Sequence, residues 1–306
     1  MRGQLAARRR LQPRAGLRVL TVIGSIVSYG LAVGAVYALI GITYNVMFTA
    51  SRVFSFTSGM LGMLGGVLGA LFITRFGLPV VIGLVLVLAC GAVIGVITEF
   101  VTVRPVLKSL EQHLYVLSTL AFALMVQQVV AIEWGTDAQP FPRLIPIGPG
   151  LIDQQFWLPM LACAATILGL EWLYRRTLVG RAFVAISEDS YAARALGLPE
   201  QGLRIASFAL AGIIGTLAGF TGAEMLLVFF GNQSILNFYG FVPVALGGMG
   251  SNRGAVIGGL ALGLFQQAAN FLLGGIFAAV AVFVVFIAIL LLRPQGLAGA
   301  ATTRRV

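Results

Sequence analysis

The residues most able to do chemistry in this sequence are polar side chains inside long apolar stretches. Glu224 stands in one such stretch, and a carboxylate in the middle of a membrane costs about 2.5 kcal/mol or more unless it is paired or hydrated. It can meet the ammonium group of a solute or a helix N-terminus, or lie near an interface with no specific role. Ser55, Thr57 and Ser58 precede a glycine series that begins at Gly59, and a helix break there exposes groups that protein or a water-filled cavity must satisfy. The chemistry expected is the passage of a small polar solute.

Residue patterns for covalent or metal chemistry are missing from the sequence. The single histidine, His113, has no metal-ligand partner nearby, and Cys90 and Cys163 each lie inside an apolar run. Lys108 is the only lysine and has no preceding Gly-x-x-x-x-Gly, so there is no phosphate-binding P-loop. We expect a protein that is not an enzyme and holds no cofactor or metal. Any ATP that drives it must be hydrolysed by another chain.

A polar segment at 177–202 interrupts the apolar pattern. Ser187 is a suitable N-cap, Glu188 and Asp189 place negative charge on the first turn, and Gly197 can end a helix in the left-handed conformation. Arg194 lies near the end of this predicted short helix. The segment either fits a groove on a soluble partner or lies at the membrane interface without one.

The elements that must position these residues follow from the composition. Hydrophobic residues make up 59 % of the chain and charged residues 10 %, which is outside the range of a soluble domain. A helix needs about 20 mostly apolar residues to cross a bilayer, and no run alternates as a barrel strand does. The predicted fold class is an all-α polytopic transmembrane helical bundle with about eight or nine spans. Candidate spans are 22–48, 54–73, 78–99, 114–133, 156–174, 205–229, 236–250, 254–273 and 276–292.

The charge distribution predicts the domain organisation and the sidedness. We divide the chain into a basic N-terminal tail (1–20), a transmembrane domain (21–293) that contains the polar loop 175–204, and a C-terminal tail (294–306). Arginines flank the spans, so the net charge of +10 indicates membrane topology and not nucleic-acid binding. The arginine-rich loops are expected in the cytoplasm and the balanced loop 134–155 outside. Counting three full spans back from a cytoplasmic Arg104 places the N-terminus outside, whereas the tail's arginines favour a cytoplasmic N-terminus, which a re-entrant part of 49–73 would allow.

Several motifs resemble those of the branched-chain amino acid ABC permease family. The polar segment carries Gly180-Arg181-Ala182, Glu188-Asp189, Ala192-Ala193 and Leu196-Gly197-Leu198 in the order and spacing of that family's cytoplasmic loop. The likeness covers nearly the whole chain from position 28 onward. It includes Glu99 with Arg104-Pro105-Val106, Leu117-Ser118-Thr119 with Gln127, Trp134-Gly135, and Gly247-Gly248-Met249-Gly250-Ser251 ahead of Gly254.

The resemblance implies a role for the loop and a set of partners. It implies that the loop is a coupling helix that docks into an ATP-binding subunit through Gly180, Arg181, Ser187, Glu188, Asp189, Ala192, Arg194 and Gly197. The implied assembly has two ATP-binding subunits, which bind ATP and Mg, a second homologous permease subunit and an extracytoplasmic substrate-binding protein. The implied location is the bacterial inner membrane, with lipid around the spans.

The substrate path and the substrate are less closely indicated. We place along the path Ser55, Thr57, Ser58, Gly59, Gln127, Glu224, Gly247 and Gly248, because two glycine-interrupted segments in opposite halves are typical of a path between repeats. Similar permeases tend to have Asn-Phe-Ala-His-Gly and then Glu where this chain has Ser55, Thr57, Ser58 and Met60. The alternatives are a stand-alone secondary transporter or facilitator of small polar solutes, with Glu224 as its coupling site, and an ABC permease for amides, urea or aromatic acids.

Overall fold

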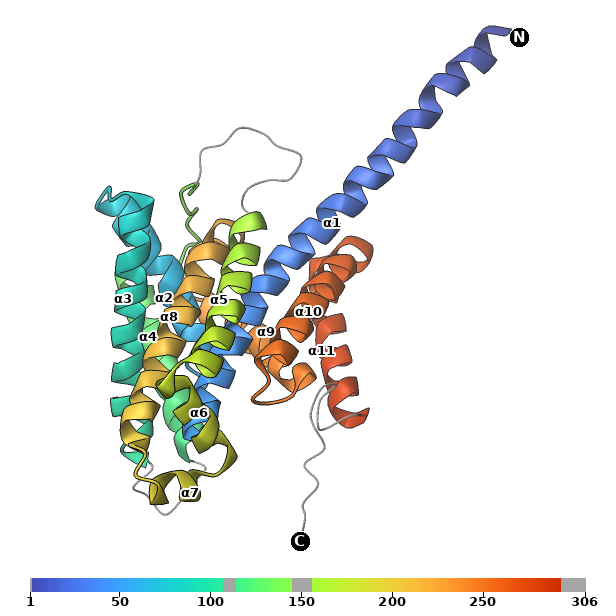
Figure 1. Cartoon of the computed structure of the whole chain (residues 1–306). Coiled ribbons are helices and arrows are strands. Elements are labelled where there is room, and N and C mark those ends of the chain that lie inside the picture. Colours follow the sequence, from blue (N-terminus) through green and yellow to red (C-terminus); the bar gives the residue numbers. More distant parts are fainter. Residues whose placement is uncertain (1, 107–113, 145–155, 293–306) are drawn as a thin grey trace.

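The computed structural model describes residues 2–106, 114–144 and 156–292, and every named element in these ranges is a helix (Figure 1). The prediction of an all-α bundle is confirmed. The elements are α1 (Arg2–Ser51), α2 (Ser58–Ala70), the π-helix η1 (Leu71–Arg75), α3 (Val80–Thr98), the π-helix η2 (Glu99–Val103), α4 (Leu114–Trp134), α5 (Trp157–Arg176), α6 (Leu178–Glu188), α7 (Ser190–Ala195), α8 (Glu200–Leu226), α9 (Asn232–Gly247), α10 (Asn252–Leu273) and α11 (Gly275–Leu292).

Among the described residues, 8 helices are long and apolar enough to cross a membrane. The stretch predicted as a span at 236–250 corresponds to α9, which has only 16 residues and contains Pro243. The segments from α1, α2 and α8 are mostly buried in the protein. Those of α3, α4, α5, α10 and α11 present most of their apolar surface outward, as expected where lipid is the solvent.

Glycines allow the helices to pack backbone against backbone. A Cβ built at Gly95 or at Gly212 would overlap the carbonyl oxygen of the facing helix, because α3 and α8 touch at these points. The same holds between α1 and α10, where Gly34 and Gly263 lie close to one another. Small residues promote this close approach, since little hydrophobic force draws helices together in lipid.

The position of α1 relates the N-terminus to the two ends of the bundle. α1 begins at the end of the bundle opposite α6 and α7, and it runs continuously from Arg2 to Ser51 (Figure 1). The end that carries α6 and α7 is rich in arginine, which is the pattern expected of a cytoplasmic side. If that end is cytoplasmic, the N-terminus lies outside, as the count of three spans back from Arg104 indicates and the tail's arginines do not. Orientation follows the summed bias of several loops, so one arginine-rich tail need not set it.

Candidate functional site

A helix break between α1 and α2 lies inside the bundle. α1 ends at Ser51 and α2 begins at Ser58, and Ser55, Thr57 and Ser58 are all buried. Non-helical backbone at membrane depth must be satisfied by protein or by a water-filled cavity. The predicted break is therefore present, and protein surrounds it.

Asn237 on α9 holds the break in place. Its Oδ1 accepts hydrogen bonds from the Tyr44 hydroxyl (2.5 Å) and from the Gly59 N–H (3.1 Å). Its Nδ2 donates to the Phe56 carbonyl oxygen (2.8 Å). One carboxamide thus joins α1, the break and the start of α2. Asn237 was not among the predicted site residues, although an amide in an otherwise apolar stretch was a usable signal.

The other polar groups of the break are partly satisfied. The Phe56 N–H donates to the Thr119 hydroxyl oxygen on α4 (3.2 Å), and the Ser55 and Thr57 hydroxyls form a hydrogen bond of 2.8 Å. The hydroxyl oxygen of Ser58 is buried and has no hydrogen-bond partner in the described part of the chain.

Aromatic rings pack beside these polar groups. Tyr44 stacks on Phe54 at a centroid distance of 5.1 Å, and Phe241 meets Phe54 edge-on at 5.3 Å. Phe56 completes the group. The break therefore combines the unpartnered Ser58 hydroxyl with an apolar wall of aromatic rings.

The remaining residues of the predicted path lie elsewhere. Gln127 is buried on α4. Glu224 lies near the outer end of α8, where its Oε1 accepts a hydrogen bond from the Leu144 N–H (2.6 Å). Gly247 packs against Gly254 at the turn between α9 and α10, and Gly248 follows with a φ of 85°. The structure brings together only Ser55, Thr57, Ser58 and Gly59 of the predicted set.

The polar segment forms two helices and not one. Thr177 caps α6 by accepting a hydrogen bond from the Gly180 N–H, and Asp189 caps α7 by accepting from the N–H groups of Tyr191 and Ala192. Ser187 is not the N-cap, because it lies within α6 and its hydroxyl bonds to a carbonyl of the same helix. Gly197 has a φ of 81°, as predicted for the end of the second helix.

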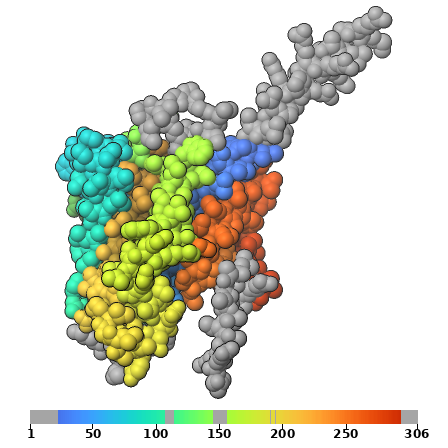
Figure 2. Space-filling model, viewed as in Figure 1, coloured from blue at the N-terminus to red at the C-terminus, as the bar shows by residue number. Residues whose placement is uncertain are grey.

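We call residues 178–197 the insert, and one side of it packs on the bundle. Phe183, Ile186 and Ala193 form a buried cluster with Ala50 at the end of α1 and Leu203 at the start of α8. The insert forms the lower end of the molecule in Figure 2. Of the other predicted coupling residues, Gly180 is buried, and Arg181, Glu188, Asp189 and Ala192 are exposed. The side chain of Arg194 lies outside the described part of the structure.

The outward side of the insert carries large apolar side chains that are mostly exposed. Leu178, Tyr191 and Leu196 are 83 %, 79 % and 83 % exposed. Tyr191 lies on α7 and Leu196 lies in the turn after it, at the end of the bundle. Exposed apolar groups on a polar connection are typical of a surface that a partner covers.

A buried ion pair lies just inside the insert. Arg204 on α8 donates from its Nε to the Glu99 Oε1 at 2.6 Å, and both residues are buried. Glu99 Oε2 is also buried and has no hydrogen-bond partner among the described residues. From the sequence, Glu99 was identified only as part of a motif, and no partner was predicted for Arg204. A cavity lies at the opposite end of the bundle.

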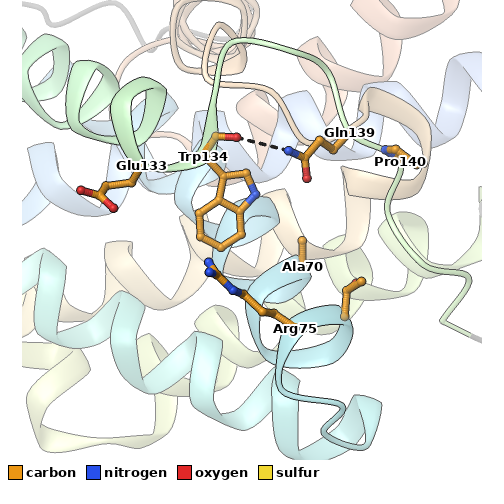
Figure 3. Close-up of a pocket in the computed structure, with 7 residues that line it drawn as sticks. Ala70, Arg75, Glu133, Trp134, Gln139 and Pro140 are labelled. Carbon is orange, nitrogen blue, oxygen red and sulfur yellow. Dashed lines mark hydrogen bonds between the residues drawn. The ribbon is translucent and has the colours of Figure 1, made fainter.

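That outer cavity, of about 260 Å³, is bordered by α2, η1 and the end of α4. In Figure 3 the Arg75 side chain points toward the Trp134 indole, whereas Glu133 points away from it. Gln139 donates to the Trp134 carbonyl oxygen at 3.2 Å. The two charged residues of the cavity, Arg75 and Glu133, are exposed and form no ion pair with each other. The cavity therefore does not present an arranged set of polar groups for a ligand. In the described ranges no group of three or more His, Cys, Asp or Glu residues could hold a metal ion.

Comparisons with known proteins agree with this architecture. Residues 26–293 match the family described as branched-chain amino acid transport system / permease component. The chain is 25 % identical over 295 residues to the high-affinity branched-chain amino acid permease protein BraD of Pseudomonas aeruginosa, covering 90 % of this chain and 96 % of that one. It is 26 % identical over 303 residues to LivH of Escherichia coli K12, with the same coverage.

A solved structure shares the fold. PsaBC from Streptococcus pneumoniae, in complex with a Fab, superposes with a TM-score of 0.51 at 13 % identity and covers 89 % of this chain and 92 % of its own. With the matched region spanning most of the chain, the protein belongs to the family of branched-chain amino acid transport system permease components and is a multi-pass transport protein of the bacterial inner membrane.

Proposed function

We propose that this chain is the transmembrane subunit of an ATP-driven importer of branched-chain or related amino acids. The observation that carries the proposal is the insert, which packs one side on α1 and α8 and presents Tyr191 and Leu196 to a partner at the cytoplasmic end. Full-length relatives named for branched-chain amino acid transport support the choice of substrate. ATP and Mg are bound by the partner chains in this proposal.

The proposed assembly has two ATP-binding subunits, a second homologous permease subunit, and a substrate-binding protein outside. Closure of the ATP-binding pair moves the two inserts and alternates the path between outward-open and inward-open states. The path passes the α1–α2 break, where the Ser58 hydroxyl and the aromatic wall meet the solute. The stand-alone transporter is less favoured, because Glu224 lies near a helix end and bonds to Leu144.

Docking is tested best at Tyr191 and Leu196. We expect Tyr191→Asp with Leu196→Asp to abolish co-purification of the ATP-binding subunits while the protein still inserts and folds, because both side chains are exposed in the isolated chain. Gly180 is a poor test position, since a Cβ there would overlap the Leu173 carbonyl oxygen and disturb folding. The control is Thr136→Asp, an exposed change at the opposite end. Retained co-purification in the double variant would refute the docking role.

The substrate is tested separately from docking. The accompanying substrate-binding protein should be protected against thermal unfolding by leucine, isoleucine or valine. Protection by an amide, urea or an aromatic acid instead would replace the amino-acid assignment and leave the ATP-driven mechanism standing.

A further inference from the structure

The ion pair between Glu99 and Arg204 continues the close contact between α3 and α8. Gly91 faces Gly212, and one turn further along α3 Gly95 faces Phe208. The next turn in the same antiparallel register brings Glu99 opposite Arg204. The pair therefore locks two helices that already touch through their backbones, and a shift of α8 along its axis would have to carry α3 with it.

On its cytoplasmic side the pair is joined directly to the insert. Leu203, which precedes Arg204, packs in the cluster with Phe183, Ile186 and Ala193 of the insert. A displacement of α6 or α7 is therefore transmitted to Leu203 in the first turn of α8. Arg204 is the residue that follows Leu203.

On its other side the pair leads to the α1–α2 break. Glu99 opens the π-helix η2, a form often found at functional sites. The Thr102 carbonyl oxygen in η2 accepts a hydrogen bond from the Ser118 hydroxyl on α4 (3.1 Å). The neighbouring Thr119 accepts the hydrogen bond from the Phe56 N–H in the break. Contacts therefore run without interruption from the insert to the break.

We propose that the Glu99–Arg204 ion pair couples movement of the insert to the α1–α2 break, so that both are positioning residues for transport and not ligands of the solute. This inference rests on the proposed docking of ATP-binding subunits at the insert. Two features favour coupling over simple stabilisation. A buried ion pair contributes little net stability compared with apolar residues of similar volume. Glu99 also keeps one buried oxygen without a partner in the described chain, which is unfavourable for stability alone.

The test measures amino acid imported per ATP hydrolysed by the assembled transporter in proteoliposomes. Glu99→Gln should lower this ratio about tenfold while the ATP-binding subunits still co-purify and hydrolyse ATP. The exchange of Glu99→Arg with Arg204→Glu should restore most of the ratio, because it rebuilds the pair in reverse. Glu99→Met with Arg204→Met removes the charges but keeps an apolar contact, so it should fold and assemble and remain uncoupled.

A matched control comes from a second ion pair in the same half of the molecule. Arg253 and Glu171 are also 2.6 Å apart, but the Arg253 side chain is 67 % exposed. Glu171→Gln should leave the ratio unchanged. A Met/Met double variant with the wild-type ratio would overturn the inference, even if Glu99→Gln fails to fold. The two proposals can fail separately. If the Tyr191 and Leu196 variant loses co-purification but the Met/Met variant keeps the wild-type ratio, the docking site is correct and the coupling role of the ion pair is wrong.

Discussion

Asn237 shows how one side chain can define the interior of a membrane bundle. It bonds to Tyr44, Phe56 and Gly59, which belong to α1, the break and α2. Each of these groups would otherwise be a polar atom in an apolar interior, where an unsatisfied donor or acceptor is costly. The amide therefore stabilises an irregular backbone that ordinary helix hydrogen bonds cannot satisfy.

Replacement of Asn237 should destabilise the fold. Asn237→Leu leaves the Phe56 carbonyl, the Gly59 N–H and the Tyr44 hydroxyl without this partner, and each orphaned group costs about 1–3 kcal/mol. Tyr44→Phe removes one hydroxyl, which donates to the Asn237 Oδ1 and lies 3.3 Å from the Asn237 carbonyl oxygen, and should cost only about 1 kcal/mol. Thermal unfolding of the purified protein in detergent would rank the two variants.

The control lies on the same helix. Asn232→Ala removes an amide that donates to the Leu227 carbonyl at the exposed start of α9, so it should change the melting temperature little. Equal melting temperatures for Asn237→Leu and Asn232→Ala would contradict the assigned role.

At the scale of elements, the packing of the helices depends on the positions of their glycines. α3 approaches α8 through Gly91 and Gly95, and the outward surface of α3 is apolar and exposed. Lipid on one side and a touching helix on the other therefore require different residue sizes on the two faces of one helix.

Enlarging the inner face should separate the two helices. Gly95→Val places a branched side chain against the Phe208 carbonyl and should cost about 1–3 kcal/mol through overpacking. Gly169→Ala on α5 is the matched change, because nothing lies within 4 Å of a Cβ built there. We expect the folded fraction after detergent extraction to fall for Gly95→Val only. A similar fall for Gly169→Ala would show that the loss of glycine's backbone flexibility, and not overpacking between α3 and α8, lowers the folded fraction.

The sequence was sufficient for features that depend on neighbouring residues. Most of the spans, the insert, the left-handed Gly197 and the break before Gly59 all followed from local composition. Contacts between distant residues did not follow. Asn237 meets Gly59, and Arg204 meets Glu99, only because helices far apart in the chain pack together, and periodicity identifies a buried face without naming its neighbour. The cap moved from Ser187 to Asp189 because Thr177 starts an earlier helix that continues past Ser187.

At the scale of the whole molecule, the fold assigns each connection to one side of the membrane. α6 and α7 lie at one end, and residues 135–144, which follow α4, lie at the other (Figure 1). If the arginine-rich end is cytoplasmic, α1 begins outside and residues 135–144 are external.

This orientation can be measured with single cysteines in a background lacking Cys90 and Cys163. Thr136→Cys should react with a membrane-impermeant maleimide in intact spheroplasts, whereas Tyr191→Cys should react only after the membrane is opened. Both positions are exposed, so burial cannot account for a difference. The reverse pattern would invert the molecule and place the insert outside.

One helix, α8, extends from the inner surface to the outer one without a break. At its outer end, Glu224 is bonded to Leu144, and Val228, just beyond the helix, pairs with Gln139. At its inner end, Arg204 is fixed to Glu99. A continuous helix that is held at both ends can transmit a displacement from one end to the other. If an ATP-binding subunit docks at the insert and a substrate-binding protein docks at the outer end, and α8 couples the two sites, then by thermodynamic reciprocity the nucleotide state must change the affinity for the substrate-binding protein.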